Sequence, residues 1–362
     1  MRIHMTGSEW FGTARGGLNR YFTDLFEALT VADGIDVSGY AFGDPPAGGS
    51  SWGDPVGGTA ARVRASLTPL PERGAILDRH FALYGPPAVG RRNGTRLVTH
   101  FHGPWSAESA MSGESAGAAR AKYFFERGRY GRSDLFVVLS DYFRDVLVED
   151  YRIDRDRIAV IPPGVDLARF TDPRSTASVP GSRDEPPVVL CVRRLERRMG
   201  IDVLLQAWDS VRTQIDDAEL VIIGTGSEEA ALRAQAEAGG HPASVTFAGD
   251  ASDAELAQAY RRASITVVPT RALEGFGLIA LESMAAGRAP IVTDVGGLPD
   301  SVRGFDDSLI LAPEDADALG DRIVRALMGE RPSPSECRAR AEQFTWERCV
   351  ERHRLAYSVI GP

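Results

Sequence analysis

Two glutamates stand eight positions apart in the segment RALEGFGLIALESMAAG, residues 271–287. Glu274 precedes a Gly-Phe-Gly turn, and Glu282 lies in the apolar helix that this turn opens. Backbone N–H groups at such a helix start lack intrahelical partners and attract an anion, above all a phosphate. One of the two carboxylates can then contact a sugar, and the other can contact a ribose. The alternative is that Glu274 only complements the helix dipole and that Glu282 is a solvated helical residue.

Two further segments carry residue types that suit a diphosphate. In CVRRLERRMG, residues 191–200, four arginines fall within six positions between an expected strand and an expected helix. A guanidinium can donate two hydrogen bonds to phosphate oxygens while it stays charged. Near the N-terminus, Gly16 and Gly17 precede a helix and permit close approach of an anion to the backbone. A solvated basic loop and an ordinary glycine turn are the alternatives for these two segments.

The elements that must position these residues alternate between short β-rich runs and helical patterns. In the first half, strands are expected at 2–5, 35–42, 97–102, 135–139 and 158–161, and helices near 18–30, 116–129 and 141–151. In the second half, strands are expected at 188–192, 220–223, 245–247, 265–268 and 290–292, and helices at 201–212, 228–238, 253–262 and after residue 277. Such alternation is typical of parallel sheets that are covered on both faces.

The domain organisation follows from a segment rich in proline, serine and charge. Residues 163–187 carry little periodicity and are interpreted as a linker between an N-terminal domain, 1–162, and a C-terminal domain, 188–345. A terminal helix within 346–362 is expected to cross back to the first domain. Ligands bind beyond the carboxyl ends of parallel strands, so two such domains facing each other predict a central cleft. Residues 43–59, rich in Gly, Pro and Ser, are predicted to form a loop.

Composition and charge exclude several classes of protein. The net charge is −9, which argues against a general nucleic-acid binder. Cys191, Cys337 and Cys349 are odd in number and lack metal-ligand spacing. A reduced, cytoplasmic setting is therefore expected. The first residues carry no secretory apolar segment, and no run of about 18 apolar residues suggests a transmembrane span. Peripheral membrane contact stays open.

Taken together and in order, these segments resemble the retaining glycosyltransferases of family 4. The Glu-x7-Glu element of that family looks like Glu274 and Glu282 with the intervening GFGL. The resemblance also covers the Gly16–Gly17 loop, IPPGVD at residues 161–166, RRLERRMG at 193–200 and the terminal FTWERCVERH. It spans nearly the whole chain, and it implies the GT-B fold, in which two Rossmann-like, doubly wound α/β domains face a cleft.

The resemblance assigns a role to each matching position. Arg194 would neutralise the donor diphosphate, Glu274 would contact the donor sugar, and Glu282 would bind the ribose hydroxyls. His102, in THFHGPW, matches the family histidine near the reacting sugar carbon. The remaining implied donor contacts are the turn and helix-start residues Gly16, Gly17, Gly275, Phe276, Gly277 and Leu278.

The chain departs from the family pattern in the arginine loop. The family usually has lysine before the glycine of this loop, whereas Met199 stands before Gly200 here. Methionine cannot bind phosphate by charge, so either Arg198 or Arg197 supplies the second cation or diphosphate binding is weaker. We favour Arg198 because it adjoins the changed position. A smaller departure is Pro163, where asparagine is common.

The reaction implied is transfer of a sugar from a nucleoside diphosphate donor, most commonly UDP, to an acceptor hydroxyl of a small molecule, natural product or glycan. The anomeric configuration is retained, and no metal or other cofactor is expected. A leaving-group oxygen would take the acceptor proton, so neither glutamate need be a nucleophile. Trp105 and Glu108 are candidate acceptor contacts. The competing classes are a dehydrogenase, a GT-B-like phosphorylase or nucleotide-sugar epimerase, and a non-catalytic sugar-binding protein.

Overall fold

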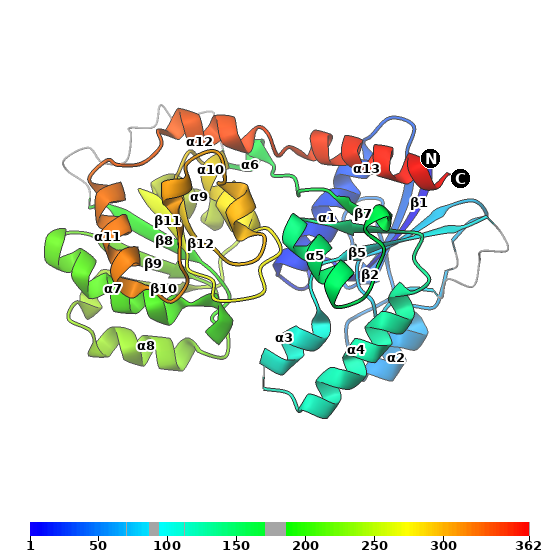
Figure 1. Ribbon diagram of the computed structural model, residues 1–362, viewed down its shortest axis with the longest axis horizontal. Helices are drawn as coiled ribbons and strands as arrows, with labels where there is room; N and C mark the ends of the chain where they lie inside the picture. Colours follow the sequence, from blue (N-terminus) through cyan, green and yellow to red (C-terminus); the bar gives the residue numbers. More distant parts are fainter. Residues whose placement is uncertain (70, 87–93, 112, 171–185, 362) are drawn as a thin grey trace. The chain divides into compact units, whose positions relative to one another are not determined.

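The chain forms two parallel β-sheets, each within its own compact unit (Figure 1). The computed structural model describes residues 1–69, 71–86, 94–111, 113–170 and 186–361. Unit 1 comprises Met1–Gly164 together with Trp346–Pro362, and unit 2 comprises Val165–Thr345. Most of the segment expected as a linker, 163–187, lies outside the described residues; of its described part, Leu167–Phe170 forms the short helix α6 in unit 2.

Unit 1 contains a seven-stranded sheet in the order β3-β2-β1-β4-β5-β6-β7. Its strands are β1 (Arg2–Glu9), β2 (Asp36–Phe42), β3 (Ser50–Ser51), β4 (Ile76–Arg79), β5 (Arg96–Phe101), β6 (Leu135–Val138) and β7 (Ile158–Val160). Its helices are α1 (Gly17–Thr30), α2 (Thr59–Ala65), α3 (Trp105–Met111), α4 (Ala116–Tyr130), α5 (Asp141–Glu149) and α13 (Trp346–Ile360). The strand residues Phe136–Val138 are almost fully buried, as expected for a parallel sheet covered on both faces.

Unit 2 contains a six-stranded sheet in the order β10-β9-β8-β11-β12-β13. Its strands are β8 (Val188–Val192), β9 (Glu219–Ile223), β10 (Val245–Gly249), β11 (Ile265–Val268), β12 (Pro290–Thr293) and β13 (Ile310–Leu311). Its longer helices are α7 (Ile201–Gln214), α8 (Glu229–Ala238), α9 (Asp253–Arg262), α10 (Leu278–Ala285), α11 (Ala316–Leu327) and α12 (Pro334–Ala341). Ser252 and Glu255 form a capping box that fixes the start of α9.

Strand order decides which loops meet at the carboxyl edge of each sheet. In unit 2, β8 pairs with β11, so the arginine loop after β8 lies beside the segment after β11 that contains Glu274. In unit 1, β4 lies between β1 and β5, so the segments after these three strands adjoin one another. In both sheets the strand order reverses at this point, which is where open α/β sheets bind ligands.

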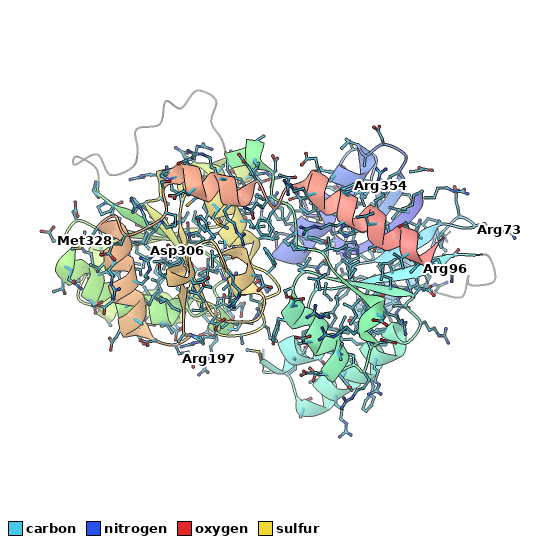
Figure 2. The ribbon with its side chains drawn as sticks, turned by 45° about the horizontal axis from the view of Figure 1, so that its top comes forward. Arg73, Arg96, Arg197, Asp306, Met328 and Arg354 are labelled. Carbon is cyan, nitrogen blue, oxygen red and sulfur yellow. The ribbon has the colours of Figure 1, made fainter. Side chains whose placement is uncertain are left out.

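The last helix, α13, belongs to unit 1 and packs against α1. Tyr357 of α13 donates a hydrogen bond of 2.6 Å to Asp78 Oδ2, and Arg354, labelled in Figure 2, donates one of 2.7 Å to the Asp33 carbonyl oxygen. Both Tyr357 and Asp78 are buried. Helix α13 therefore contributes Tyr357 to the interior of the first unit.

Most predicted elements agree with the structure, and some short or late elements were missed. The helix predicted at 253–262 and the strands predicted at 188–192 and 265–268 coincide with α9, β8 and β11. The predicted loop at 43–59 contains the two-residue strand β3. The elements β4, α2, α3, β13, α11 and α12 had not been predicted. No helix among the described residues is long and apolar enough to cross a membrane.

Candidate functional site

Helix α10 starts at a glycine whose backbone conformation disfavours other residues. Gly277 is the N-cap residue with φ 82°, in the left-handed region, and a Cβ added there would lie 2.3 Å from Leu298 Cδ1. No side chain among the described residues caps this helix. Because the first N–H groups of a helix have no intrahelical acceptor, this end of α10 can receive an anion.

The neighbouring positions divide into exposed and structural residues. Gly275 and Leu278 are partly exposed, whereas Phe276 is buried with its ring centroid 5.5 Å from that of Phe344. The Phe276 side chain therefore anchors the turn within unit 2, and only the backbone of this position can face a ligand.

Glu274 is held from two sides. Arg193 Nη2 lies 2.5 Å from Glu274 Oε2 and also donates to Thr270 Oγ1. The Glu274 carbonyl oxygen accepts a hydrogen bond of 2.9 Å from the N–H of Gly297. The Arg193 side chain is only 6% exposed, while the Glu274 side chain is 18% exposed. Arg193 thus lies behind the glutamate and leaves part of the carboxylate open to solvent.

Glu282 is oriented by a buried tyrosine. Tyr260 on α9 donates a hydrogen bond of 2.9 Å from its hydroxyl group to Glu282 Oε2 on α10. Tyr260 is fully buried, and its pKa is raised well above the usual range, first by burial and then by the adjacent carboxylate. It therefore remains a hydrogen-bond donor, while Glu282 is partly exposed.

The four arginines of the loop after β8 do not form one common cationic cluster. Arg193 is buried against Glu274, whereas Arg194 and Arg197 are exposed, as Figure 2 shows for Arg197. Arg198 is partly exposed and donates a hydrogen bond of 3.0 Å to the carbonyl oxygen of Leu273. This bond ties the loop to the residue that precedes Glu274.

Met199 is 4% exposed and points into unit 2 as a core side chain. It follows Arg197 and Arg198 in a short 3₁₀ turn that ends at Gly200, where φ is 71°. A Cβ at Gly200 would lie 1.9 Å from the Pro269 carbonyl oxygen. The arginine loop is therefore packed directly against the chain that leaves β11.

In unit 1, Gly16 and Gly17 lie at the start of α1. Gly16 has φ 158° and accepts a hydrogen bond of 2.9 Å from the N–H of Arg20. A Cβ added at either glycine would meet nothing within 4 Å. No side chain caps α1 within the described residues. This helix start is therefore open to a ligand, although packing alone does not require glycine at either position.

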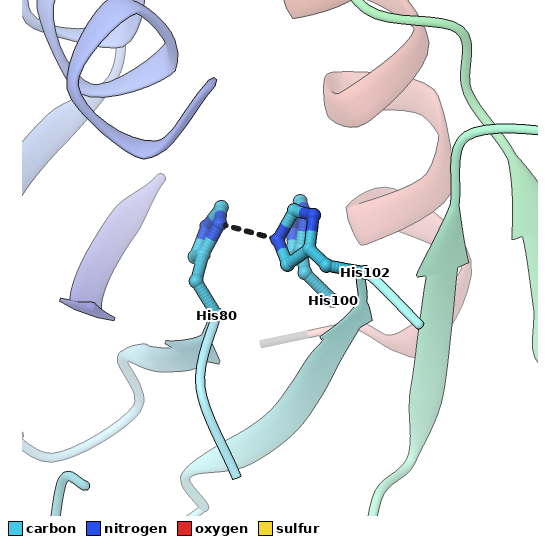
Figure 3. A group of neighbouring side chains, drawn as sticks. All are labelled: His80, His100 and His102. Atoms are coloured by element: carbon cyan, nitrogen blue, oxygen red, sulfur yellow. Dashed lines mark hydrogen bonds between the residues drawn. The ribbon is translucent and has the colours of Figure 1, made fainter. Parts of the chain in front are cut away.

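His102 follows β5 and belongs to a cluster of histidines (Figure 3). Its Nε2 lies 3.3 Å from Nδ1 of His80, and one nitrogen atom from each of His80, His100 and His102 lies within 4.8 Å of the others. His102 is partly exposed, whereas His80 and His100 are buried. The pKa of His102 is held well below its usual value, mainly by burial and then by the other two rings.

The two candidate acceptor contacts lie on α3. The Trp105 ring is partly exposed, with Lys122 Nζ 4.6 Å from its centroid and the Phe81 ring at 6.0 Å. Its backbone N–H donates to buried Glu126, which caps the start of this helix. The side chain of Glu108 lies outside the described part of the structure.

The sequence did not single out the partners that hold these residues. No motif marks Tyr260, Thr270, Asp78 or His80, and in the sequence Arg193 looks like the other arginines of its loop, although it holds Glu274. His80 had one available signal, since RHF at 79–81 and THFH at 99–102 each place a histidine directly after a parallel strand. The strand before His80, β4, had not been predicted.

Two family models match consecutive parts of the chain. Residues 15–169 match the model described as "Glycosyltransferase Family 4", and residues 174–344 match "Glycosyl transferases group 1". The D-inositol 3-phosphate glycosyltransferase of Nocardia farcinica is 34% identical over 321 residues, which cover 83% of this chain and 70% of that protein. The chain belongs to the family 4 glycosyltransferases.

Solved structures support the fold of that family. A sucrose-phosphate synthase from Thermosynechococcus elongatus has a TM-score of 0.76 and 25% identity, with 99% of both chains covered. The Anabaena protein HepE in complex with UDP-glucose has a TM-score of 0.73 and 16% identity, covering 99% of both chains, and shows the fold alone. The fold is GT-B, with two Rossmann-like parallel-sheet domains, as the sequence predicted.

The curated relatives also set a limit on this likeness. The chain spans 58% of the length of one relative, an inositol-phosphate glycosyltransferase, and 53% of the length of another, a mannosyltransferase. Family membership favours a transferase over a phosphorylase, an epimerase, a dehydrogenase or a sugar-binding protein.

Proposed function

We propose that the protein transfers a sugar from a nucleoside diphosphate donor to an acceptor hydroxyl, with retention of the anomeric configuration. The observation that carries this proposal is the placement of Glu274. It is partly exposed, held by buried Arg193 at 2.5 Å, and followed by the uncapped start of α10. A carboxylate beside an anion-binding helix end suits a sugar that is linked to a phosphate.

The nucleotide and the diphosphate are assigned to the same edge of unit 2. Glu282, which Tyr260 orients, binds the ribose hydroxyls, and the backbone of Gly275–Leu278 binds sugar or phosphate oxygens. Exposed Arg194 neutralises the leaving diphosphate. Arg198, tied to the Leu273 carbonyl oxygen, supplies the second cation in place of the lysine that Met199 replaces.

The two glycines and the histidine of unit 1 complete the assignment. Gly16 and Gly17 allow the start of α1 to approach the diphosphate, and His102 contacts the sugar near the reacting carbon. Guanidinium groups and helix N–H groups stabilise the charge that develops on the leaving group, a task that needs no metal ion. A leaving-group oxygen takes the acceptor proton, so Glu274 positions the sugar rather than attacking it.

Unit 1 is assigned to acceptor binding, with Trp105 and Glu108 as first candidates for contacts to the acceptor. An exposed aromatic face can stack on a sugar ring, as the partly exposed ring of Trp105 would allow. UDP-sugars are the donors to test first. A cytoplasmic location is proposed because all three cysteines are free thiols, each of them buried.

The test begins with a panel of nucleotide sugars scored by thermal stabilisation, since a ligand of the folded state raises the unfolding temperature. The donor that stabilises best is then incubated with alcohol and glycan acceptors, and release of nucleoside diphosphate is measured. Glu274→Ala should keep the fold and lose turnover. Absence of stabilisation by every nucleotide sugar would contradict the proposal, as would full turnover in Glu274→Ala.

A further inference from the structure

The histidine cluster of unit 1 is organised around one buried carboxylate. Asp78, at 0% exposure, accepts a hydrogen bond of 2.6 Å from the Tyr357 hydroxyl group at Oδ2 and lies 3.0 Å from His100 Nε2 through Oδ1. Burial alone would raise the pKa of Asp78, yet His100 and His80 hold it well below its usual range. The carboxylate is therefore ionised. Each nitrogen or oxygen atom that faces it is more stable when that atom carries a hydrogen.

His80 lies between this carboxylate and His102. Its Nε2 is 3.6 Å from Asp78 Oδ2, beyond hydrogen-bond length but within strong electrostatic reach. Its Nδ1 is 3.3 Å from Nε2 of His102. A neutral imidazole has one N–H and one lone pair, so placing the hydrogen of His80 on one nitrogen determines the role of the other. The anion favours the hydrogen on Nε2, which leaves Nδ1 as an acceptor.

The ring planes argue for a hydrogen-bonded chain rather than a metal centre. His80 and His100 stack with centroids 3.8 Å apart and planes 19° apart, and the His102 plane is 25° from both (Figure 3). Imidazole lone pairs lie in the ring plane. Three nearly parallel planes cannot all direct lone pairs at one ion, as a tetrahedral zinc site requires.

We infer that Asp78 acts through His80 to fix the tautomer of His102, so that His102 carries its hydrogen on Nε2 and presents Nδ1 as a hydrogen-bond acceptor. His102 Nε2–H then donates to His80 Nδ1. No hydrogen bond to Nδ1 of His102 is formed within the described residues, and the ring is partly exposed. The group that it recognises is a hydroxyl that donates, as in a sugar, rather than a phosphate oxygen, which can only accept.

Asp78 and His80 are thus positioning residues, because both side chains are buried. A carboxylate that holds an imidazole in the tautomer its task needs is a known device in hydrolases, where converting the acid to its amide reverses the tautomer. The functional meaning of this arrangement rests on the proposed transferase activity. The tautomer itself does not, because it can be measured in the free protein.

The direct test is long-range ¹H–¹⁵N correlation NMR of the full chain with ¹⁵N-labelled histidine rings, above pH 7. His102→Gln identifies the His102 signals by their loss. We expect a protonated Nε2 and an unprotonated Nδ1 at His102. A protonated Nδ1, or a signal that averages both tautomers, would overturn the inference whatever the outcome of any activity assay.

Two variants extend the test, and a third serves as a control. Asp78→Asn offers an amide N–H to His80 Nε2, which should move the His80 hydrogen to Nδ1 and the His102 hydrogen to its own Nδ1. If Asp78→Asn does not fold, His80→Gln should give averaged His102 signals. His80→Gln should also lower kcat about 10- to 100-fold, the usual cost of losing an orienting partner.

The control is His4→Gln, because His4 lies on β1, close to Ser38 and stacked on Tyr40, apart from the cluster. It should leave the His102 tautomer and kcat unchanged. An unaltered His102 spectrum in both Asp78→Asn and His80→Gln would overturn the inference. So would stoichiometric binding of Zn²⁺ that disappears in His102→Gln, since the nitrogens would then be metal ligands.

Discussion

Replacing Arg193 by methionine should separate Glu274 from the buried group that holds it. Methionine keeps much of the volume of the side chain but removes the guanidinium 2.5 Å from Glu274 Oε2. Removing one partner of a buried ion pair costs about 3–5 kcal/mol. Because the Glu274 side chain is 18% exposed, water can solvate the released carboxylate, and we expect a loss of about 2–3 kcal/mol in the free energy of unfolding.

The same change should lower turnover, because Glu274 would no longer be fixed toward the sugar. A misplaced substrate contact of about 1 Å can cost roughly 100-fold in rate. We expect kcat/KM for the donor to fall about 30- to 100-fold, equivalent to about 2–2.7 kcal/mol. Urea unfolding and initial-rate kinetics of nucleoside diphosphate release measure the two effects. Arg325→Met is the matched control, since Arg325 is exposed on α11 of the same unit, outside the arginine loop.

A double-mutant cycle decides whether the two residues act as a pair. If Arg193 works through Glu274, combining Arg193→Met with Glu274→Gln should cost less than the sum of the single changes, with a coupling energy of about 1–3 kcal/mol. Additive losses would refute the reasoning. Unchanged stability and turnover in Arg193→Met would refute it as well.

Four further predictions concern other parts of the chain. Tyr260→Phe removes the 2.9 Å hydrogen bond to Glu282 and should weaken nucleoside diphosphate binding about five- to tenfold in calorimetry, with exposed Tyr142→Phe as the neutral control. Gly277→Ala should destabilise the protein more than Gly34→Ala in urea unfolding, because both have positive φ but only Gly277 would clash, with Leu298. Arg198→Ala should raise the donor Kd, and unchanged donor affinity and turnover would remove this residue from the diphosphate assignment. Burial lowers the pKa of His353 to about 4, so the contribution of the neutral ring to stability is present above pH 6.5 and is lost as the pH falls toward 4. In His353→Gln, the slope of the unfolding free energy against pH between 5 and 6 should be shallower by up to about 1.4 kcal/mol per pH unit. A slope identical to that of the unchanged protein would contradict this.

The fold could be predicted where the sequence gives β-rich apolar runs or a clear helix start. Continuous apolar runs such as 188–192 and 265–268 indicate buried parallel strands, and the Ser252–Glu255 pair marks the start of α9. The strand β4 is as long as β11 but escaped prediction, because its four residues include Asp78 and Arg79, which do not resemble an apolar strand. Both are buried because Asp78 meets Tyr357 and Arg79 donates to the Pro86 carbonyl oxygen, contacts that depend on the tertiary fold.

The candidate site could be predicted only to the level of its first contacts. The spacing of Glu274 and Glu282 and the turn between them are local in sequence, so they identify the helix start. The groups that orient them come from other strands and helices, 81 positions away for Arg193 and 22 for Tyr260. Adjacent arginines look alike in sequence, yet the loop after β8 buries Arg193 and exposes Arg194.

The proposed activity is retaining sugar transfer from a nucleoside diphosphate donor whose sugar Glu274 contacts. Following the anomeric proton of an α-linked donor by ¹H NMR during transfer tests this most directly. We expect a product with the same anomeric configuration, one nucleoside diphosphate released per transfer, and no product with Glu274→Ala. A product of inverted configuration, or an undiminished rate with Glu274→Ala, would contradict it.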